Sequence, residues 1–387
     1  MDLRALPDGL TPAQRIDERR KRIEEELSMD LKILTPQSKT IGNADEKNCE
    51  QMFGHIPVPV GLAGPLKIQQ FSNQQSATMY LPLATTEGAL VASVNRGCKA
   101  LTESGGVMTQ SIHHGITRSI AFKITDESSS PIAEINHHQK QWKAIGEKTS
   151  SHLKILRYDV DTENEYVFLN IACATDEAMG MNMVTIAAQA IGEWLAEFID
   201  GLEFVTVAGN VDSDKKPSQR THSQGRGYEV RASAHIPKKI IESILKSTPE
   251  AMLEVAKAKL EVGSGIAGAI GKNLHAANMI AALYLATGQD AAHVVEGSLT
   301  DTTVKKSGDG IDISVRCPAI LIGIRGGGTA LPAQSKALEI ILKEKTDLHP
   351  CAQLAESIGA GVLAGELSLL AAQANHTLAK AHGKLGR

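Results

Sequence analysis

The sequence of 387 residues contains few aromatic residues, which make up 3% of the chain. Sites that stack nucleic-acid bases or sugar rings depend on aromatic side chains, so both kinds of site are disfavoured. The chain also lacks a large excess of either charge, because 40 basic residues accompany 44 acidic ones and leave a formal net charge of -4. This balance excludes a generally basic nucleic-acid-binding protein, although it does not exclude a local basic groove.

Paired cysteines and long apolar runs are missing as well. The cysteines are odd in number and widely scattered, without a Cys-x-x-Cys pair: Cys49, Cys98, Cys173, Cys317 and Cys351. We therefore expect no disulfide framework and no metal site, in a reducing compartment. Residues 1–10 lack the apolar core of a secretory signal, and the charge-free run Asn273–Gln289 has polar residues typical of a buried helix. These features predict a cytoplasmic protein.

What is present is the composition of a folded protein, with 42% hydrophobic and 22% charged residues and a length that suits two or three domains. The clearest pattern lies in residues 118–209, where strands and helices follow the order β-α-β-β-α-β of the ferredoxin-like split unit. The predicted elements are Ser119–Ile124, Ile132–Lys148, Leu153–Val160, Tyr166–Ala174, Ala178–Ile199 and Phe204–Val207. Because the ends of such a unit lie close together, we expect an inserted domain.

Outside this unit the apolar pattern predicts mainly helices. They are Ala13–Leu34, Lys238–Leu260, Gly263–Ala286, Pro332–Lys345 and Gly359–Lys380, with one strand-like segment at Ile313–Ile324. Residues Gly263–Gly268 match Gly-x-Gly-x-x-Gly, but a helix-like segment precedes them where a dinucleotide fingerprint needs a strand. We interpret these glycines as sites of close helix packing.

Four ionisable side chains in small-residue surroundings are the candidates for chemistry. Glu87 adjoins an apolar run, so we expect it to be partly buried, which raises the pKa of a carboxyl group toward that of a general acid. Its structural alternative is a helix N-terminal Glu that supports Thr85 or Thr86. Lys215 and Lys216 follow a predicted strand end, where they could hold an oxyanion or a phosphate, or simply form a surface turn.

The other two candidates are Asp290 and His382. Asp290 follows an apolar helix, where an acidic side chain is electrostatically unfavourable, and such a placement hints at a function. His382 lies near the end of the chain, where a histidine is informative only if the other motifs agree with it.

The motifs around these residues resemble those of the hydroxymethylglutaryl-CoA reductase family, and its eukaryotic and archaeal class more than its second bacterial class. The matching segments are collinear over about residues 50–387: Pro57–Leu66, Thr85–Gly88, Asn95–Cys98, Gly180–Met183, Gly209–Pro217, His275–Asn278, Gly288–Ala292, Gly326–Thr329 and Leu378–His382. The resemblance implies an α+β fold with a large helix-rich substrate and CoA domain, an inserted ferredoxin-like cofactor domain and a small helical N-terminal part.

The resemblance also implies the activity. Such oxidoreductases reduce (S)-3-hydroxy-3-methylglutaryl-CoA to mevalonate and CoA with two NADPH, in the mevalonate pathway of isoprenoid biosynthesis. By this resemblance Lys215 stabilises the reacting carbonyl oxygen, Glu87 donates a proton and Asp290 tunes both. His382, on a mobile tail, protonates the departing thiolate. We expect a homodimer or a dimer of dimers with active sites at the subunit interface, and no nucleic-acid or membrane partner.

Ligand-binding residues follow by position in the motifs. Those expected to bind substrate are Ser93, Asn95, Arg96, Arg118, Asn210, Asp214, Lys216, Lys259, His275 and Asn278. Those expected to bind NADPH are Ser150, Ser151, Asp176, Glu177, Met179, Gly180, Met181, Asn182, Gly326, Gly327 and Arg387. The helix that opens at Gly180 would offer free backbone N–H groups to the pyrophosphate.

The implied division of the chain is a helical segment at 1–49, a large domain at 50–117 and 218–387, a cofactor domain at 118–209 and a catalytic connecting loop at 210–217. Two departures from the family pattern bear on the cofactor. Glu177 stands where Asp is usual, and no Arg follows Ser150-Ser151 to hold a 2′-phosphate, so NADH remains an option beside NADPH. The alternatives are an NAD-dependent enzyme that oxidises mevalonate to the thioester and a non-catalytic CoA-thioester-binding protein.

Overall fold

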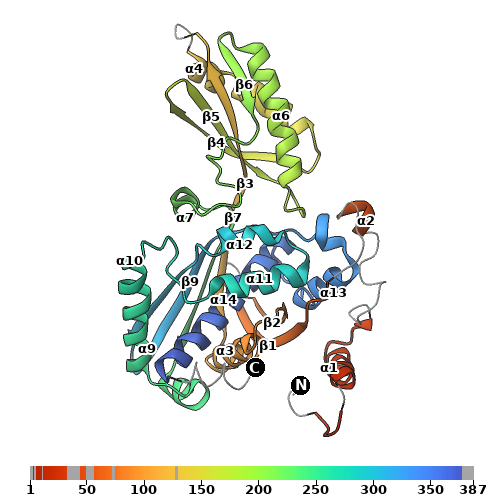
Figure 1. Cartoon of the computed structure of the whole chain (residues 1–387), viewed down its shortest axis with the longest axis vertical. Helices are drawn as coiled ribbons and strands as arrows, with labels where there is room; N and C mark the ends of the chain where they lie inside the picture. The colour runs from red at the N-terminus through yellow and green to blue at the C-terminus, as the bar shows by residue number, and fades with distance from the viewer. Residues whose placement is uncertain are drawn as a thin grey trace.

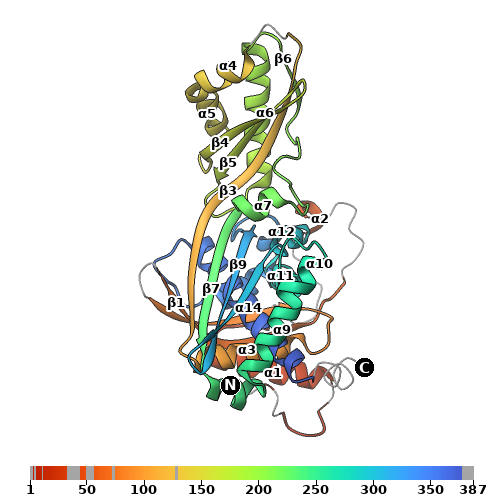
Figure 2. The same ribbon diagram turned by 90° about the vertical axis from the view of Figure 1, so that its left-hand side faces the viewer.

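The computed structural model describes residues 3, 6–10, 12–32, 44–48, 56–71, 75–126 and 130–376. They form a smaller upper part that stands on a larger lower part (Figure 1). The two parts share one long strand, β3 (Val107–Ile124), which rises out of the lower sheet into the upper one (Figure 2). Its lower half pairs with β1 and β7 as far as Gly115, and its upper half pairs with β5 and β6 from Ile116 onward.

The upper part is an antiparallel sheet in the order β6-β3-β5-β4, against which the helices α5 and α6 pack. Its further elements are α4 (Pro131–His137), α5 (Gln139–Lys148), β4 (Lys154–Glu163), β5 (Tyr166–Ala174), α6 (Met181–Phe198) and β6 (Leu202–Thr206). The element order β-α-β-β-α-β expected from the sequence is present, although the first helix is divided at His138. Trp142, Leu169 and Ile191 belong to a core of its own, separate from that of the lower part.

The lower part contains a sheet in the order β2-β1-β3-β7-β9-β8. Its further strands are β1 (Val60–Gln70), β2 (Ser76–Ala84), β7 (Gly227–Ile236), β8 (Asp301–Ser307) and β9 (Gly310–Ile320). The helices packed with it are chiefly α3 (Leu90–Glu103), α9 (Pro249–Ala256), α11 (Ala276–Thr287), α13 (Pro332–Ile341) and α14 (Pro350–Ala374). The remaining elements are α1 (Pro12–Leu27), α2 (Ala44–Lys47), α7 (Gln219–Gln224), α8 (Lys238–Ile240), η3 (Ile241–Leu245), η4 (Lys257–Gly263), α10 (Ser264–Ile266), η5 (Ala291–His293), α12 (Val294–Gly297) and η6 (Gly327–Ala330).

Helix α14 forms the centre of the lower core. Among the described helices it is the one that is long and apolar enough to cross a membrane, and 94% of its apolar window is buried inside the protein. It packs closely on α3, because a Cβ atom at Gly97 would lie 2.0 Å from the carbonyl oxygen of Ala364. Only glycine permits this approach, so any larger side chain at residue 97 must push the two helices apart.

The helix predicted at Ala13–Leu34 ends at Leu27, and two further predicted helices are interrupted in the structure. The segment Gly263–Ala286 is not one buried helix: α10 ends at Ile266, residues 265–269 are exposed and α11 begins at Ala276. Gly268 has a φ of +64°, a left-handed conformation that commonly ends a helix. The segment Lys238–Leu260 is broken at Lys246, after which Thr248 accepts a hydrogen bond from the Ala251 N–H and caps α9.

Candidate active site

An ion pair at the junction of the two parts joins two of the predicted catalytic side chains. Lys215 Nζ lies 2.8 Å from Asp290 Oδ2, and both side chains are partly exposed to solvent. Partial burial raises the pKa of Asp290, but hydrogen bonds from Lys215 and from the Ala292 N–H, with the nearby His293, outweigh it and leave the pKa below its usual range. A carboxylate therefore holds the ammonium group at the surface of the site.

The loop that carries Lys215 is held in a strained conformation. Asn210, Ser213 and Lys215 have φ values of +65°, +52° and +58°, in the left-handed region that residues with a side chain rarely adopt. Each such residue costs about 1–3 kcal/mol and persists only where the surroundings fix it. The N–H of Lys215 donates to Glu296 Oε1 at 2.6 Å, and the N–H of Ser213 donates to the Asn210 carbonyl at 3.0 Å.

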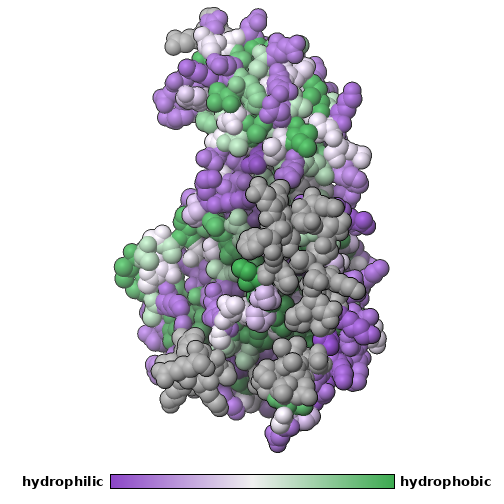
Figure 3. All heavy atoms as spheres, turned by 45° about the vertical axis from the view of Figure 1, so that its right-hand side comes forward, coloured by the Kyte–Doolittle hydropathy of each residue, from purple (hydrophilic) through white to green (hydrophobic). Residues whose placement is uncertain are grey.

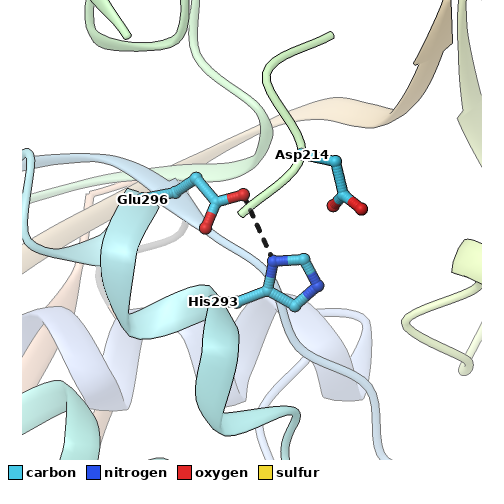
Figure 4. A group of neighbouring side chains, drawn as sticks. All are labelled: Asp214, His293 and Glu296. Atoms are coloured by element: carbon cyan, nitrogen blue, oxygen red, sulfur yellow. Dashed lines mark hydrogen bonds and ion pairs between the residues drawn. The ribbon is translucent and has the colours of Figure 1, made fainter. Parts of the chain in front are cut away.

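Behind this loop lies a buried charged network centred on Arg226, whose side chain is 1% exposed. Its Nη1 donates to Glu296 Oε1 at 2.8 Å and its Nη2 to Asp214 Oδ1 at 3.0 Å. Its Nε donates to Thr117 Oγ1 at 2.8 Å, so the network reaches β3. Figure 4 shows Asp214, Glu296 and His293 around one space, with a dashed line between Glu296 and His293.

Arg118 continues this network into the upper part. Its Nε donates to Thr185 Oγ1 of α6 at 2.9 Å, and its Nη1 lies 3.5 Å from Asp212 and 3.4 Å from Asp214. Burial raises the pKa of Asp212 despite Arg226 and Arg118, whereas the pKa of the partly buried Asp214 is lowered by the two arginines and His293. The predicted substrate residues Arg118 and Asp214 are thus next to the Lys215 loop, while Lys216 is exposed and donates to the Asp214 carbonyl at 3.0 Å.

Asp214, His293 and Glu296 also form a cluster with metal-ligand spacing, since their ligand atoms lie within 4.8 Å of one another. The guanidinium of Arg226 already bonds to both carboxylates. A divalent cation placed there would face a fixed positive charge at short range, which opposes binding. The cluster therefore fits a guanidinium better than a metal ion.

Glu87 differs from the prediction of a partly buried acid, because the structure exposes it on the loop between β2 and α3. Its backbone N–H donates to Thr85 Oγ1 at 3.0 Å, but the N-cap of α3 is Ala89, so Glu87 is not the helix N-terminal residue of the structural alternative either. Within the described residues it makes no ion pair with Lys215. The apolar residues that follow Glu87 in the sequence belong to α3 and face α14. They bury one side of α3 and do not cover Glu87.

Several predicted substrate residues on α3 contact other parts of the lower core. Ser93 Oγ lies 2.9 Å from Ser368 Oγ, and Arg96 donates to the Ser368 side chain at 3.0 Å and to its carbonyl at 2.7 Å. Asn95 Oδ1 accepts from the Gly64 N–H at 3.0 Å, and Lys259 Nζ is 3.5 Å from Gln373 Oε1. These four residues therefore gather at the C-terminal half of α14.

The α3 residues and the cofactor region contact different ends of α14. At its start, Cys351 Sγ is 3.5 Å from the carbonyl of Glu177, at the cofactor end. Ser368, which contacts α3, is 17 residues further along, or about 25 Å at 1.5 Å per residue. Glu87 lies in the chain between these regions, because Ala84, three residues before it, packs with Ala286, four residues before Asp290, and α3 begins at Leu90.

His275 and Asn278 stand at the start of α11, beside the C-terminal half of α14. The buried carboxylate of Glu366 accepts hydrogen bonds from the N–H groups of Leu274 and His275 at 2.7 and 2.8 Å. It therefore occupies the unpaired donors before α11 and fixes where that helix begins. His275 Nε2 is buried without a hydrogen-bond partner among the described residues.

The predicted cofactor residues gather around the N-terminus of α6. Gly180 has a φ of +91°, and a Cβ atom there would lie 2.4 Å from the Thr175 side chain. Asp176 lies 2.8 Å from His152 Nδ1 and 3.5 Å from His349 Nε2. A hydrogen bond from His152, helped by His349, lowers the pKa of Asp176 against a smaller opposing effect of burial.

The glycine loop after β9 meets both the cofactor end and the Asp290 segment. The carbonyl of Glu177 accepts from the N–H of Ile324 at 2.8 Å, and the Glu177 carboxylate pairs with the Arg325 side chain. Buried Gln289 exchanges hydrogen bonds with the Gly323 backbone at 2.9 and 3.0 Å. Gly326 and Gly327 have φ values of +77° and +55° and open space around them.

The remaining predicted cofactor residues extend the same surface. Ser150 Oγ accepts from the His152 N–H at 3.2 Å, Ser151 and Asn182 are exposed, and Met179 and Met181 flank the left-handed Gly180. Met181 Sδ is 3.2 Å from Arg226 Nη2, which ties the start of α6 to the buried network. His382 and Arg387 lie outside the described residues.

The profile of the hydroxymethylglutaryl-coenzyme A reductase family matches residues 15–387. The chain belongs to this family. It is 41% identical over 377 residues to the 3-hydroxy-3-methylglutaryl-coenzyme A reductase of Pyrococcus horikoshii, covering 95% of this chain and 91% of that protein. It is 37% identical over 383 residues to 3-hydroxy-3-methylglutaryl-coenzyme A reductase 1 of Dictyostelium discoideum, covering 96% of this chain and 68% of that protein.

A solved structure of the class II reductase of Streptococcus pneumoniae bound to NADPH shares the fold. It superposes with a TM-score of 0.71 at 17% identity, over 92% of this chain and 96% of that one. The archaeal and amoebal relatives near 40% identity therefore confirm the expected family and the affinity to its eukaryotic and archaeal class. The family membership makes the chain an oxidoreductase.

Arg226, His293, Glu296 and Gln289 were missed as site residues by the sequence analysis. The spacing Asp290-x-x-His293-x-x-Glu296 was a usable signal, because residues three apart share one face of a helical turn. Arg226 offered no signal, since its partners come from β3, the Lys215 loop and α12.

Proposed function

We propose that this chain reduces (S)-3-hydroxy-3-methylglutaryl-CoA to mevalonate and CoA with two NADPH. The observation that carries the proposal is the Lys215–Asp290 ion pair at the junction with the α6 N-terminus, in a chain of this family. One thioester, two hydride ions and two protons give one primary alcohol and one thiol. Each hydride transfer places charge on the substrate oxygen, and the Lys215 ammonium is the group that stabilises it.

The other residues of the site are assigned roles in the same reaction. Asp290 holds the ammonium group in place, and Arg118 with Lys216 supplies positive charge for the substrate carboxylate. Glu87 is proposed as the proton donor to the oxygen and His382 as the proton donor to the thiolate. The N–H groups at the start of α6 are proposed to bind the dinucleotide pyrophosphate, with Asp176 or Glu177 near a ribose.

We propose that the complete site needs a second copy of the chain. Ser93 and Arg96 of α3 contact Ser368 in the C-terminal half of α14, whereas Cys351 at its start lies beside Glu177 of the cofactor region, so a second copy is proposed to bring the set together around the Lys215–Asp290 pair. Val262 in η4 and Ile266 in α10 are 52% and 84% exposed, and hydrophobic side chains also gather on the protrusion at the left of Figure 3. Such a patch beside Lys259 suits a subunit contact.

The proposed domain division has support in the pairing of β3. The strand changes partners between Gly115 and Ile116, within two residues of the proposed boundary at 117/118. After β6 the chain returns to the lower part and enters the Lys215 loop directly. The inserted cofactor domain therefore delivers its ligand beside the catalytic loop at 210–217.

Oxidation of mevalonate with NAD⁺ is the second candidate, because the Asp176 carboxylate lies beside Ser150 and His152 where a 2′-phosphate would need positive charge. The test compares kcat/KM for NADPH and NADH in both directions with purified protein. The proposal expects consumption of NADPH with hydroxymethylglutaryl-CoA and its loss in Lys215→Ala. No turnover, or turnover unchanged in Lys215→Ala, overturns it.

A further inference from the structure

Two buried ionisable side chains behind the Lys215–Asp290 pair have no role in the proposed reaction. His293 ends η5 and Glu296 lies in α12, and both side chains are 0% exposed. They follow Asp290 at intervals of three residues, so all three face one side of the same turn. Burial of an ionisable group costs free energy of folding unless the group is paired. The presence of two such groups behind the ion pair therefore suggests that they act on the site.

One carboxylate oxygen of Glu296 contacts three nitrogen atoms. Its Oε1 accepts from the Lys215 N–H at 2.6 Å and from Arg226 Nη1 at 2.8 Å, and it lies 3.3 Å from His293 Nδ1 (Figure 4). The Lys215 N–H belongs to the residue whose φ is +58°. The Glu296 carboxylate is therefore the group that holds the catalytic lysine in its left-handed backbone conformation.

His293 connects the same carboxylate to Asp290. Its Nδ1 faces Glu296, and its Nε2 lies 3.7 Å from Asp290 Oδ2, the oxygen that also pairs with Lys215. Within the described residues, His293 Nε2 and Glu296 Oε2 have no hydrogen-bond partner. A series of contacts therefore runs from Lys215 Nζ through Asp290, His293 and Glu296 to the Lys215 N–H, in which His293 and Asp290 are at ion-pair distance and not hydrogen-bonded.

We propose that Glu296 and His293 are a positioning pair that fixes both members of the Lys215–Asp290 ion pair relative to each other. Glu296 acts on the backbone of Lys215, and His293 acts on the carboxylate of Asp290. The proposal rests on the proposed function, in which the Lys215 ammonium must meet an oxygen where charge develops. Displacement of such a group by about 1 Å costs roughly 100-fold in rate, so a support of this kind affects kcat directly.

The test uses two matched pairs of full-length variants. Glu296→Gln keeps an acceptor for the Lys215 N–H, whereas Glu296→Ala removes it. His293→Asn keeps an amide nitrogen at the Nδ1 position facing Glu296, and His293→Gln places one at the Nε2 position facing Asp290. We expect kcat to fall about 10- to 100-fold in Glu296→Ala, with KM for hydroxymethylglutaryl-CoA nearly unchanged, and to be partly restored in Glu296→Gln.

A buried glutamate outside the site provides the control. Glu356 is 2% exposed and accepts from Thr109 Oγ1 at 2.6 Å and Ser111 Oγ at 2.9 Å, so its hydrogen-bond partners belong to β3 and not to the Lys215 loop. Glu356→Ala removes a similar buried carboxylate, so we expect it to lower the melting temperature while kcat per folded molecule stays the same. Equal effects of Glu296→Ala and Glu356→Ala on kcat would overturn the positioning role.

A second measurement keeps the inference separate from the proposed function. Acetic anhydride labelling, read by mass spectrometry, compares the amine reactivity of Lys215 with that of its neighbour Lys216. We expect the Lys215 to Lys216 ratio to rise at least about threefold in Glu296→Ala and in His293→Asn, because the pair with Asp290 loosens. Wild-type protein without turnover would refute the proposed function alone, and an unchanged labelling ratio would refute the positioning pair alone.

If Glu296→Ala does not fold, the labelling ratios of His293→Asn and His293→Gln are compared instead. Equal ratios in these two variants would overturn the role of the Asp290 contact.

Discussion

Replacement of Arg226 by methionine tests the buried network through stability. The guanidinium is 1% exposed and bonds to Glu296 at 2.8 Å, to Asp214 at 3.0 Å and to Thr117 at 2.8 Å. Methionine has similar length and no charge, so the change leaves the buried Glu296 carboxylate without its cationic partner. Removal of one member of a buried pair costs about 3–5 kcal/mol, because the other charge stays in a medium that solvates it poorly.

The assay is urea unfolding at pH 7 of wild type, Arg226→Met, Glu296→Gln and the double variant. The double variant removes both charges, so it should be more stable than the sum of the single effects predicts, with a coupling of about 1 kcal/mol or more. A surface control is Arg231→Met, whose side chain is 63% exposed and pairs with Glu229, and it should cost less than about 1 kcal/mol. A cost of Arg226→Met as small as that of the control, with additive effects in the double variant, would refute the reasoning.

Four further predictions concern activity. Asp290→Asn should lower kcat about 100-fold or more, because the Lys215 ammonium loses its carboxylate, and steady-state NADPH consumption measures this. The lowered pKa of Asp290 means that the carboxylate and its ion pair persist as the pH falls toward the ordinary carboxyl range. The acid loss of kcat due to Asp290 should therefore lie below that range, and a loss already complete above it would contradict this. Asp176→Ser removes a negative charge near the proposed position of the 2′-phosphate, so it should raise the ratio of kcat/KM for NADPH to kcat/KM for NADH roughly tenfold. An unchanged ratio would mean that Asp176 does not lie near the 2′-phosphate. Mixing of the inactive Glu87→Gln and Lys215→Ala proteins under subunit exchange should restore about a quarter of wild-type activity if each site combines two chains, whereas no recovery would mean that one chain forms the site.

Local patterns predicted the parts of the structure that depend on short segments. The strand Tyr166–Ala174 has the bounds of β5, and the order β-α-β-β-α-β is visible because each element has its own periodicity and turn. The Lys215–Asp290 pair followed from the family motifs. The burial of Glu87 was wrong, because apolar neighbours in sequence bury the helix after it and not the loop on which it stands.

Long-range contacts were beyond the reach of the sequence. The helix at Gly263–Ala286 was predicted as continuous because its residues are small and apolar, but left-handed glycine and exposed chain interrupt it. The buried network combines β3, the Lys215 loop, β7 and α12, which the chain brings together only after β3 has passed through both sheets. No local periodicity reports such an assembly.

The stoichiometry of the reaction tests the central claim most directly. Purified protein is given limiting hydroxymethylglutaryl-CoA, and NADPH consumed is compared with thiol released and mevalonate formed. The account predicts two NADPH per CoA and per mevalonate, with both signals lost in Lys215→Ala. Thiol release without NADPH consumption, or full turnover in Lys215→Ala, would contradict it.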